Sequence, residues 1–327
     1  MTFLKRRTAV AVMGAVALAS LATTAAAQTV TLRLHQFLPP QAVIPAKALV
    51  PWAQKVEADS GGRIKVQLFH AMQLGGAPPQ LFDQARDGVV DLTWTVLGYT
   101  PGRFPKTEVF ELPFMSGDPE ASSRAIHEYV EKFAADEFKD VKLIAAHTHG
   151  PGLFHTKAPV TGLESLRGMK IRGGSRIINN MLTKLGATPV GMPVPGVTEA
   201  LSKGVIDGTT IPWEVTPSLK VTELVKNHTT FAGKEGLYTQ TFAFSMNKAS
   251  YDKLPPRPQG RDRQELRHRD GRHVWPCHGR GRPGGPGDCG KGQEQHRGAG
   301  PGGNPALAPH RGQRGNRLDQ RGQGQRH

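Results

Sequence analysis

Two patterns of apolar residues alternate along the chain between residues 30 and 247. Alternation of apolar and polar positions predicts strands, whereas an apolar period near 3.6 predicts helices. Strands are predicted at 30–39, 141–147, 169–173, 205–211 and 237–247, and at the ends of segments 45–69 and 79–96. Helices are predicted at the starts of these two segments and at 119–138, 175–187 and 196–203. Strands that alternate with helices predict an α/β fold with mostly parallel sheets.

A faint internal repeat indicates two similarly built halves. Residues 84–94 and 199–210 both follow the order helix, glycine, Val, Val or Ile, Asp, strand. Roughly 230 residues are large for one core and comfortable for two. We therefore expect lobe I to comprise 28–149 plus 237–255, and lobe II to comprise 150–236. A crevice between two such lobes is a natural ligand site.

The first 27 residues have the pattern of a secretory signal. Lys5, Arg6 and Arg7 precede an apolar run that is too short to span a bilayer, and three alanines end the segment. We expect cleavage before Gln28 and export of a soluble mature chain. The alternatives are an uncleaved membrane anchor and, from the paired arginines, a twin-arginine signal.

Charge and cysteine are concentrated at the other end of the chain. The formal net charge is +15, and residues 256–327 hold 15 Lys and Arg against 6 Asp and Glu. Both cysteines, Cys277 and Cys289, also lie there. The body before residue 256 is therefore only mildly basic, and it has no disulfide, thiol nucleophile or Cys-ligated metal.

Segment 256–327 is rich in Gly, Arg, Pro, Gln and His, and it has too few large apolar residues to form a core. It is predicted to be disordered. One interpretation is an RGG-like nucleic-acid tail, which conflicts with export. Another is a frameshift near codon 256, because permitted codons for 257–273, read one base later, give the amphipathic sequence DLKAVIDKNSGIATAAM. Sequencing the locus tests this hypothesis.

Several motifs occur in a consistent order: LRLHQFLPP, WAQKVEADSGGRIKVQLF, QLGGAPPQLFDQARDGVVDL, LESLRGMKIR, LGATPVGMPVPGVTEALSKGVIDG and YDKLP. On these motifs, residues 30–255 resemble the periplasmic solute receptors of TRAP transporters, the DctP family. The resemblance implies the two-lobed fold of periplasmic solute-binding proteins (type II-like). It also implies capture of a small organic acid and delivery to a membrane permease.

The resemblance assigns the central role to Arg172, the arginine of the G-x-K-x-R motif. In this family that arginine typically forms a bidentate pair with the substrate carboxylate, a geometry that suits a planar guanidinium. A second family arginine, about twenty residues earlier, is replaced here by Gly152. His147, His149 or His155 are candidate donors in its place.

The other expected ligand-binding residues are Gln36, Phe37, Trp94, His149, Thr210 and Trp213, with Tyr99 and Glu214 as weaker candidates. Aromatic side chains offer apolar area for a ligand, but each of these rings is equally suited to packing inside a lobe. His147 and His149 also share one strand face, but no third spaced ligand completes a zinc site. We expect no metal and no cofactor.

The body contains no serine nucleophile elbow, zinc-protease helix motif or cysteine nucleophile. We therefore expect a binding protein and not an enzyme. The alternatives are a periplasmic enzyme acting on a small carboxylic acid, and a nucleic-acid or interaction protein that uses the basic tail. Turnover of a bound ligand supports the first, and binding that weakens steeply with salt supports the second.

Overall fold

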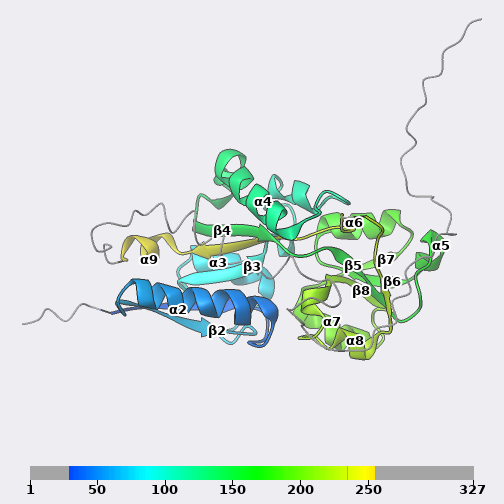
Figure 1. The fold of residues 1–327 in the computed structure, drawn as a ribbon, viewed down its shortest axis with the longest axis horizontal. Helices are drawn as coiled ribbons and strands as arrows, with labels where there is room; N and C mark the ends of the chain where they lie inside the picture. Colours follow the sequence, from blue (N-terminus) through cyan, green and yellow to red (C-terminus); the bar gives the residue numbers. More distant parts are fainter. Residues whose placement is uncertain (1–28, 234, 255–327) are drawn as a thin grey trace, which may run out of the picture.

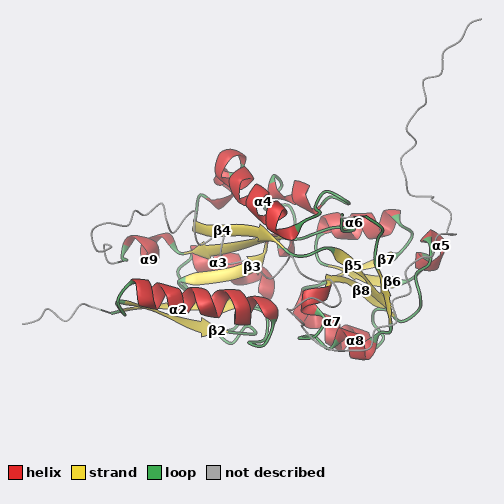
Figure 2. Cartoon of the chain, viewed as in Figure 1, coloured by secondary structure: helices red, strands yellow, loops and turns green. Residues whose placement is uncertain are grey.

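The computed structural model describes residues 29–233 and 235–254 (Figure 1). They form two five-stranded sheets that lie one after the other along the long axis of the molecule, each packed with helices (Figure 2). The predicted signal at 1–27 and the tail at 256–327, with its frameshift hypothesis, lie outside the described residues. Among the described residues, no helix combines the length and apolar character that a bilayer span requires.

The strand order of the first sheet is β2 (Ile64–Phe69), β1 (Val30–Gln36), β3 (Leu92–Val96), β10 (Thr241–Met246) and β4 (Lys142–Thr148). The strand order of the second sheet is β7 (Thr188–Gly191), β6 (Lys170–Gly173), β8 (Gly208–Pro212), β5 (Gly152–Thr156) and β9 (Asn227–Thr229). The α/β class and the paired lobed architecture are thus confirmed, while the lobe boundaries stay a prediction.

Both sheets repeat one pairing scheme. In the first sheet β1 is parallel to β2 and β3, whereas β10 is antiparallel to β3 and β4. In the second, β6 is parallel to β7 and β8, whereas β5 is antiparallel to β8 and β9. Four of the five strands in each sheet therefore run in the same direction, as expected, and one strand, β10 or β5, runs in the opposite direction. The exception arises because β5 and β10 each enter their sheet directly from the other one, without a crossover helix.

The internal repeat seen in the sequence has a structural cause. Asp91 precedes β3 and accepts a hydrogen bond from the backbone N–H of Arg33 at 2.8 Å. Asp207 precedes β8 and accepts one from the backbone N–H of Lys170 at 2.9 Å. Each aspartate thus links the third strand in the order of its sheet to the second strand. The two sheets therefore contain the same hydrogen bond at equivalent positions.

Around the first sheet lie the helices α2 (Val50–Asp59), α3 (Leu81–Arg86), α4 (Pro119–Phe133) and α9 (Lys248–Asp252). Around the second lie α5 (Leu163–Leu166), α6 (Arg176–Lys184), α7 (Val197–Ser202) and α8 (Val221–Leu224). The helices α2, α3, α4, α6 and α7 lie within the segments predicted as helical, whereas the short helices α5, α8 and α9 were not predicted.

Local sequence explains where these helices begin. Asp118 accepts a hydrogen bond from Ala121 N–H at the start of α4, and Ser175 accepts one from Ile178 N–H at the start of α6, as N-cap residues do. The helix predicted at 119–138 is divided at Ala134, where α4 ends and a 3₁₀ turn follows.

Within the part of the chain that the structure describes, two segments lie between the sheets: residues 149–151, between β4 and β5, and residues 237–240, before β10. We call them the crossing segments. They lie side by side, because Gly152 N–H donates to Tyr238 O at 2.9 Å and Leu237 N–H donates to Gly152 O at 3.2 Å. The strand predicted at 237–247 accordingly divides into a crossing segment and β10.

Candidate ligand-binding cavity between the two sheets

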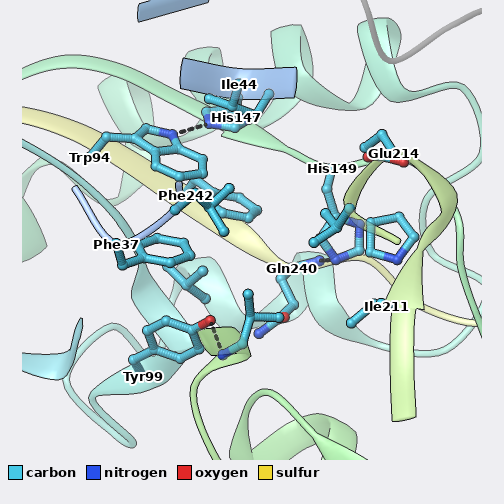
Figure 3. Close-up of a pocket in the computed structure, with 15 residues that line it drawn as sticks. Phe37, Ile44, Trp94, Tyr99, His147, His149, Ile211, Glu214, Gln240 and Phe242 are labelled. Carbon is cyan, nitrogen blue, oxygen red and sulfur yellow. Dashed lines mark hydrogen bonds between the residues drawn. The ribbon is translucent and has the colours of Figure 1, made fainter. Parts of the chain in front are cut away.

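A cavity lies between the two sheets, beside the crossing segments (Figure 3). The centres of water-sized molecules have about 40 Å³ of space in it, and its empty space is about 450 Å³ when open solvent at its mouth is included. The second sheet and its loops contribute mainly aliphatic side chains, including Val194, Ile211 and Val215. The first sheet contributes aromatic rings, so the cavity is predominantly apolar, as small-molecule sites are.

The aromatic wall consists of Phe37, Trp94, Phe242 and His147, which come from β1, β3, β10 and β4 or the residues just after them. Phe37 and Trp94 stack with centroids 4.9 Å apart and an interplanar angle of 8°. Phe242 stacks on Trp94 at 5.1 Å and on His147 at 4.7 Å. These near-parallel rings form a stacked aromatic wall against which an apolar ligand can pack.

Both cavity histidines are committed to hydrogen bonds within the protein. His147 Nε2 accepts from Trp94 Nε1–H at 2.9 Å, and its Nδ1 donates to the carbonyl of Thr148. His149 Nε2 accepts from the backbone N–H of Gln240 at 3.1 Å, and its Nδ1 donates to the carbonyl of the next residue. These contacts assign the neutral tautomer to each ring. They disfavour the expected role of either ring as a donor to the ligand.

Arg172 lies in β6, one residue before the end of the strand, and is 0% exposed. Its Nε donates to Met192 O at 2.8 Å and its Nη1 donates to Thr210 O at 3.1 Å. Its Nη2 has no hydrogen-bond partner among the described residues, and no described carboxylate forms an ion pair with it. A buried cation without a counter-charge is costly, so this guanidinium is prepared for an anion.

Two phenols lie close to this guanidinium. Burial raises the pKa of Tyr99, and the charge of Arg172 is the largest effect that opposes the rise. The pKa of Tyr238 is likewise raised by burial and lowered by Arg172. Tyr99 lines the cavity, and its hydroxyl accepts from Val194 N–H at 2.9 Å (Figure 3). Arg172 therefore lies close to Tyr99, a residue of the cavity lining, but is not itself part of that lining.

Thr210 is adjacent to Arg172 but is directed at the backbone. Its hydroxyl donates to Arg172 O at 3.1 Å, and its carbonyl accepts from Nη1. Thr210 thus fixes the arginine from the neighbouring strand β8.

Two expected site residues lie away from the cavity lining. Trp213 packs against His155 and His228, with ring centroids 4.9 Å apart in each case. The amide of Gln36 is occupied by both backbone groups of Leu38 and by the ring of His70. The structure therefore brings Phe37, Trp94 and His149 together around the cavity and places Arg172 close to its lining. Their roles in binding stay predictions.

Besides the aliphatic lining, sequence reasoning missed Tyr238, Gln240 and Phe242, which lie in or near the cavity lining. They alternate within the segment predicted as a strand at 237–247, a spacing that places side chains on one face. That spacing was an available signal for a shared surface. It could not show that this surface faces the second sheet.

A carboxylate also lines the cavity. Glu214 lies across from the aromatic wall (Figure 3), and its Oε1 accepts from Gly150 N–H at 2.8 Å. Within the described part of the chain, no group of three or more His, Cys, Asp or Glu residues is placed to hold a metal ion.

Polar contacts link the two sheets beside the cavity. Arg176, the first residue of α6, donates through Nε to Glu108 at 2.8 Å and through Nη2 to the second carboxylate oxygen. Glu111 accepts from the N–H and hydroxyl of Thr241 at 3.1 and 3.0 Å. Burial raises the pKa of Glu111 to about 7, while the Ser175 hydroxyl of the second sheet opposes the rise.

Solved structures of solute-binding proteins resemble this arrangement. A TRAP solute-binding protein from a marine metagenome, specific for aromatic acid ligands and solved with 3-hydroxybenzoate, is 52% identical with a TM-score of 0.70. The match covers 76% of this chain and 75% of that one. A TRAP solute-binding protein from Rhodoferax ferrireducens, solved with copurified benzoate, is 51% identical with a TM-score of 0.69. Here the match covers 75% of this chain and 74% of that one.

Sequence comparisons agree. A solute-binding protein of Verminephrobacter eiseniae is 31% identical over 243 residues, which is 72% of this chain and 70% of that protein. Two other curated relatives are matched over only 60% of their length. The family model described as bacterial extracellular solute-binding protein, family 7, matches residues 36–267, extending past the expected limit at residue 255. The chain therefore belongs to this family of extracellular solute-binding proteins, the DctP family.

Proposed function

We propose that this protein is the periplasmic receptor of a TRAP-type transporter, that it captures an aromatic monocarboxylate between its two sheets, and that it delivers this ligand to a membrane permease. The observation that carries the proposal is the buried guanidinium of Arg172, which has no carboxylate partner among the described residues. A ligand carboxylate supplies the missing charge and an acceptor for Nη2.

The cavity favours an aromatic body for this acid. The stacked rings of Phe37, Trp94 and Phe242 belong to the aromatic wall, and an aromatic ring gains offset stacking there beyond the burial of its area. Two related proteins of known structure, each about half identical to this chain, were solved with benzoate or 3-hydroxybenzoate. Each of these ligands has a carboxylate, which suits the Arg172 guanidinium, and an aromatic ring, which suits the aromatic wall.

Binding without turnover follows from the same chemistry. The groups around the cavity include donors and aromatic rings, which suit capture of an aromatic anion. The carboxylate in the lining, that of Glu214, accepts a hydrogen bond from a backbone N–H. Export by the segment at 1–27 and docking to the permease complete the proposed transport role. Closure of the two sheets around the ligand then gives the permease a surface distinct from that of the empty receptor.

Calorimetry with benzoate, 3-hydroxybenzoate, mandelate and an aliphatic acid of similar size tests this function. We expect the aromatic acids to bind and to be recovered unchanged. Arg172→Met should weaken benzoate binding by about 100-fold or more, because it removes a charge-assisted bidentate contact. Arg124→Gln, which removes a surface arginine paired with Glu120, is the matched control. Unaltered binding by Arg172→Met refutes the proposal, and chemical conversion of the acid favours the enzyme alternative.

A further inference from the structure

Three hydrogen-bond donors beside the cavity lack an acceptor among the described residues: Arg172 Nη2, Tyr238 Oη and Gln240 Nε2. Their side chains belong to residues that are 0%, 1% and 4% exposed. Buried polar groups in proteins are nearly always paired, and an unpaired buried donor destabilises the fold. Three such donors in one region indicate a missing acceptor.

Two glycines allow Tyr238 and Gln240 to reach this region. A Cβ atom at Gly152 would lie 2.2 Å from the Tyr238 ring, and a Cβ atom at Gly174 would lie 2.5 Å from the amide oxygen of Gln240. Gly174 follows Arg172 by two residues, so the amide lies beside the end of β6. The backbone of Gln240 is fixed in turn by His149, and its side chain points into the cavity (Figure 3).

Tyr238 lies near the guanidinium itself. The charge of Arg172 acts on the Tyr238 phenol and is the largest effect that lowers its pKa, whereas burial raises that pKa further. The Thr210 hydroxyl also lowers it, but the two hydroxyls form no hydrogen bond of ordinary geometry. The phenol therefore stays protonated at neutral pH and retains a proton to donate.

We propose that Tyr238 and Gln240 complete, together with Arg172, a three-donor seat for the ligand's carboxylate, and that this seat selects the carboxylate over its uncharged amide. The inference rests on the proposed function and deepens it, because it assigns ligand contacts to two residues of the second crossing segment. It also makes that segment, which joins the two sheets, part of the binding site.

The selectivity comes mainly from Arg172, because its guanidinium is always charged and offers donors only. An ionised carboxylate has two oxygens with about four acceptor sites, enough to satisfy all three donors at once. A primary amide brings no negative charge to the guanidinium, and an NH₂ group that faces Arg172 leaves that donor and the ligand's own N–H unpaired. Sites with buried polar groups reject ligands that leave those groups unpaired.

Calorimetry on the full chain with benzoate and benzamide tests the seat. We use Tyr238→Phe and Gln240→Met, which keep side-chain size while removing the donor. Each should weaken benzoate binding by about 10-fold or more, leave benzamide binding unchanged or stronger, and leave the melting temperature of the unliganded protein unchanged or higher. Tyr129→Phe, whose ring packs between Phe110 and Phe133 on α4, is the control and should bind benzoate like the parent.

The outcomes separate this inference from the proposed function. If the parent binds benzoate and both variants bind it within twofold of the parent, the seat is wrong and the receptor function stands. A loss of benzoate and benzamide binding by equal factors, with a lower melting temperature, shows a purely structural role and also overturns the seat. If the parent binds no aromatic carboxylate, the function and the seat both fail.

Discussion

Glu108 and Arg176 connect the two sheets through a two-point ion pair. Glu108 lies in the 3₁₀ turn η4 (Thr107–Glu111) beside the first sheet, and Arg176 begins α6 beside the second. The Glu108 side chain is 7% exposed and that of Arg176 is 46% exposed. Because this contact requires the two sheets to be close together, it stabilises the arrangement that encloses the cavity.

Arg176→Gln is therefore expected to weaken ligand binding without touching the ligand. We expect a few-fold loss of affinity, mostly through faster release, because the pair stabilises only the closed arrangement. Added salt screens a partly exposed pair, so the difference from the parent should shrink at high ionic strength. Stopped-flow release measurements at two salt concentrations check this. Lys203→Gln, which removes a surface pair on α7, is the control, and equal release rates at low salt contradict the prediction.

Glu111 predicts a pH dependence of stability. Its pKa is raised from 4.5 to about 7 by burial, so the folded protein holds this proton more tightly than the unfolded chain. The stabilisation is fully present below pH 4.5 and is lost as the pH rises to about 7, a change of about 3 kcal/mol at most in the free energy of unfolding.

Glu111→Gln should remove this decline, because the amide does not ionise in that range. Urea unfolding at several pH values between 4 and 8 measures the slope. Glu128→Gln changes an exposed carboxylate on α4 paired with Lys132 and should keep the parental slope. An unchanged slope in Glu111→Gln would show that another group controls the pH dependence.

Gly152 should not tolerate a methyl group. Its added Cβ would approach the Tyr238 ring to 2.2 Å, and the ring is held by the backbone pairing between the crossing segments. We expect Gly152→Ala to reduce the free energy of unfolding by about 1–3 kcal/mol through overpacking. Gly162→Ala is the matched control, because a Cβ there meets no atom within 4 Å. Equal urea midpoints for the two variants would contradict the packing described here.

Phe37 is expected to favour aromatic over aliphatic acids. Phe37→Leu retains an apolar side chain but loses the stacked ring next to Trp94. Stacking is worth about 0.5–1.5 kcal/mol, so benzoate affinity should fall about 3- to 10-fold while the affinity for hexanoate changes little. Competition binding with the two acids measures the ratio, and a parallel loss for both acids would mean that Phe37 only shapes the cavity.

Much of the fold was predictable because periodicity is a local property. The strands β1, β3, β4 and β6 and the helices α2, α6 and α7 follow their apolar patterns, and the Asp91 and Asp207 repeat correctly indicated duplicated architecture. β5 was missed because it is short and begins directly after Gly150 and Pro151, residues that are typical of a turn. The antiparallel direction of β5 and β10 was also missed, because the sequence of a strand does not show which strand it pairs with.

The site was harder to predict because its residues gather from distant parts of the chain. From the sequence alone, Trp94 and Trp213 are equally good candidates for the pocket. In the folded protein Trp213 packs against His155, and this contact lies away from the cavity. The motif resemblance located Arg172, but its carbonyl partners at Met192 and Thr210 depend on strands that meet only in the folded protein. Gln240 could not be predicted as a site residue for the same reason.

The two crossing segments, joined by hydrogen bonds between Gly152 and residues 237 and 238, have a mechanical consequence. We expect two segments joined in this way to act as a hinge, because rotation about them preserves their hydrogen bonds. Sliding or twisting of the segments would break these hydrogen bonds. We therefore expect the two halves to separate on the side away from these hydrogen-bonded segments, and we expect a solute to enter on that side.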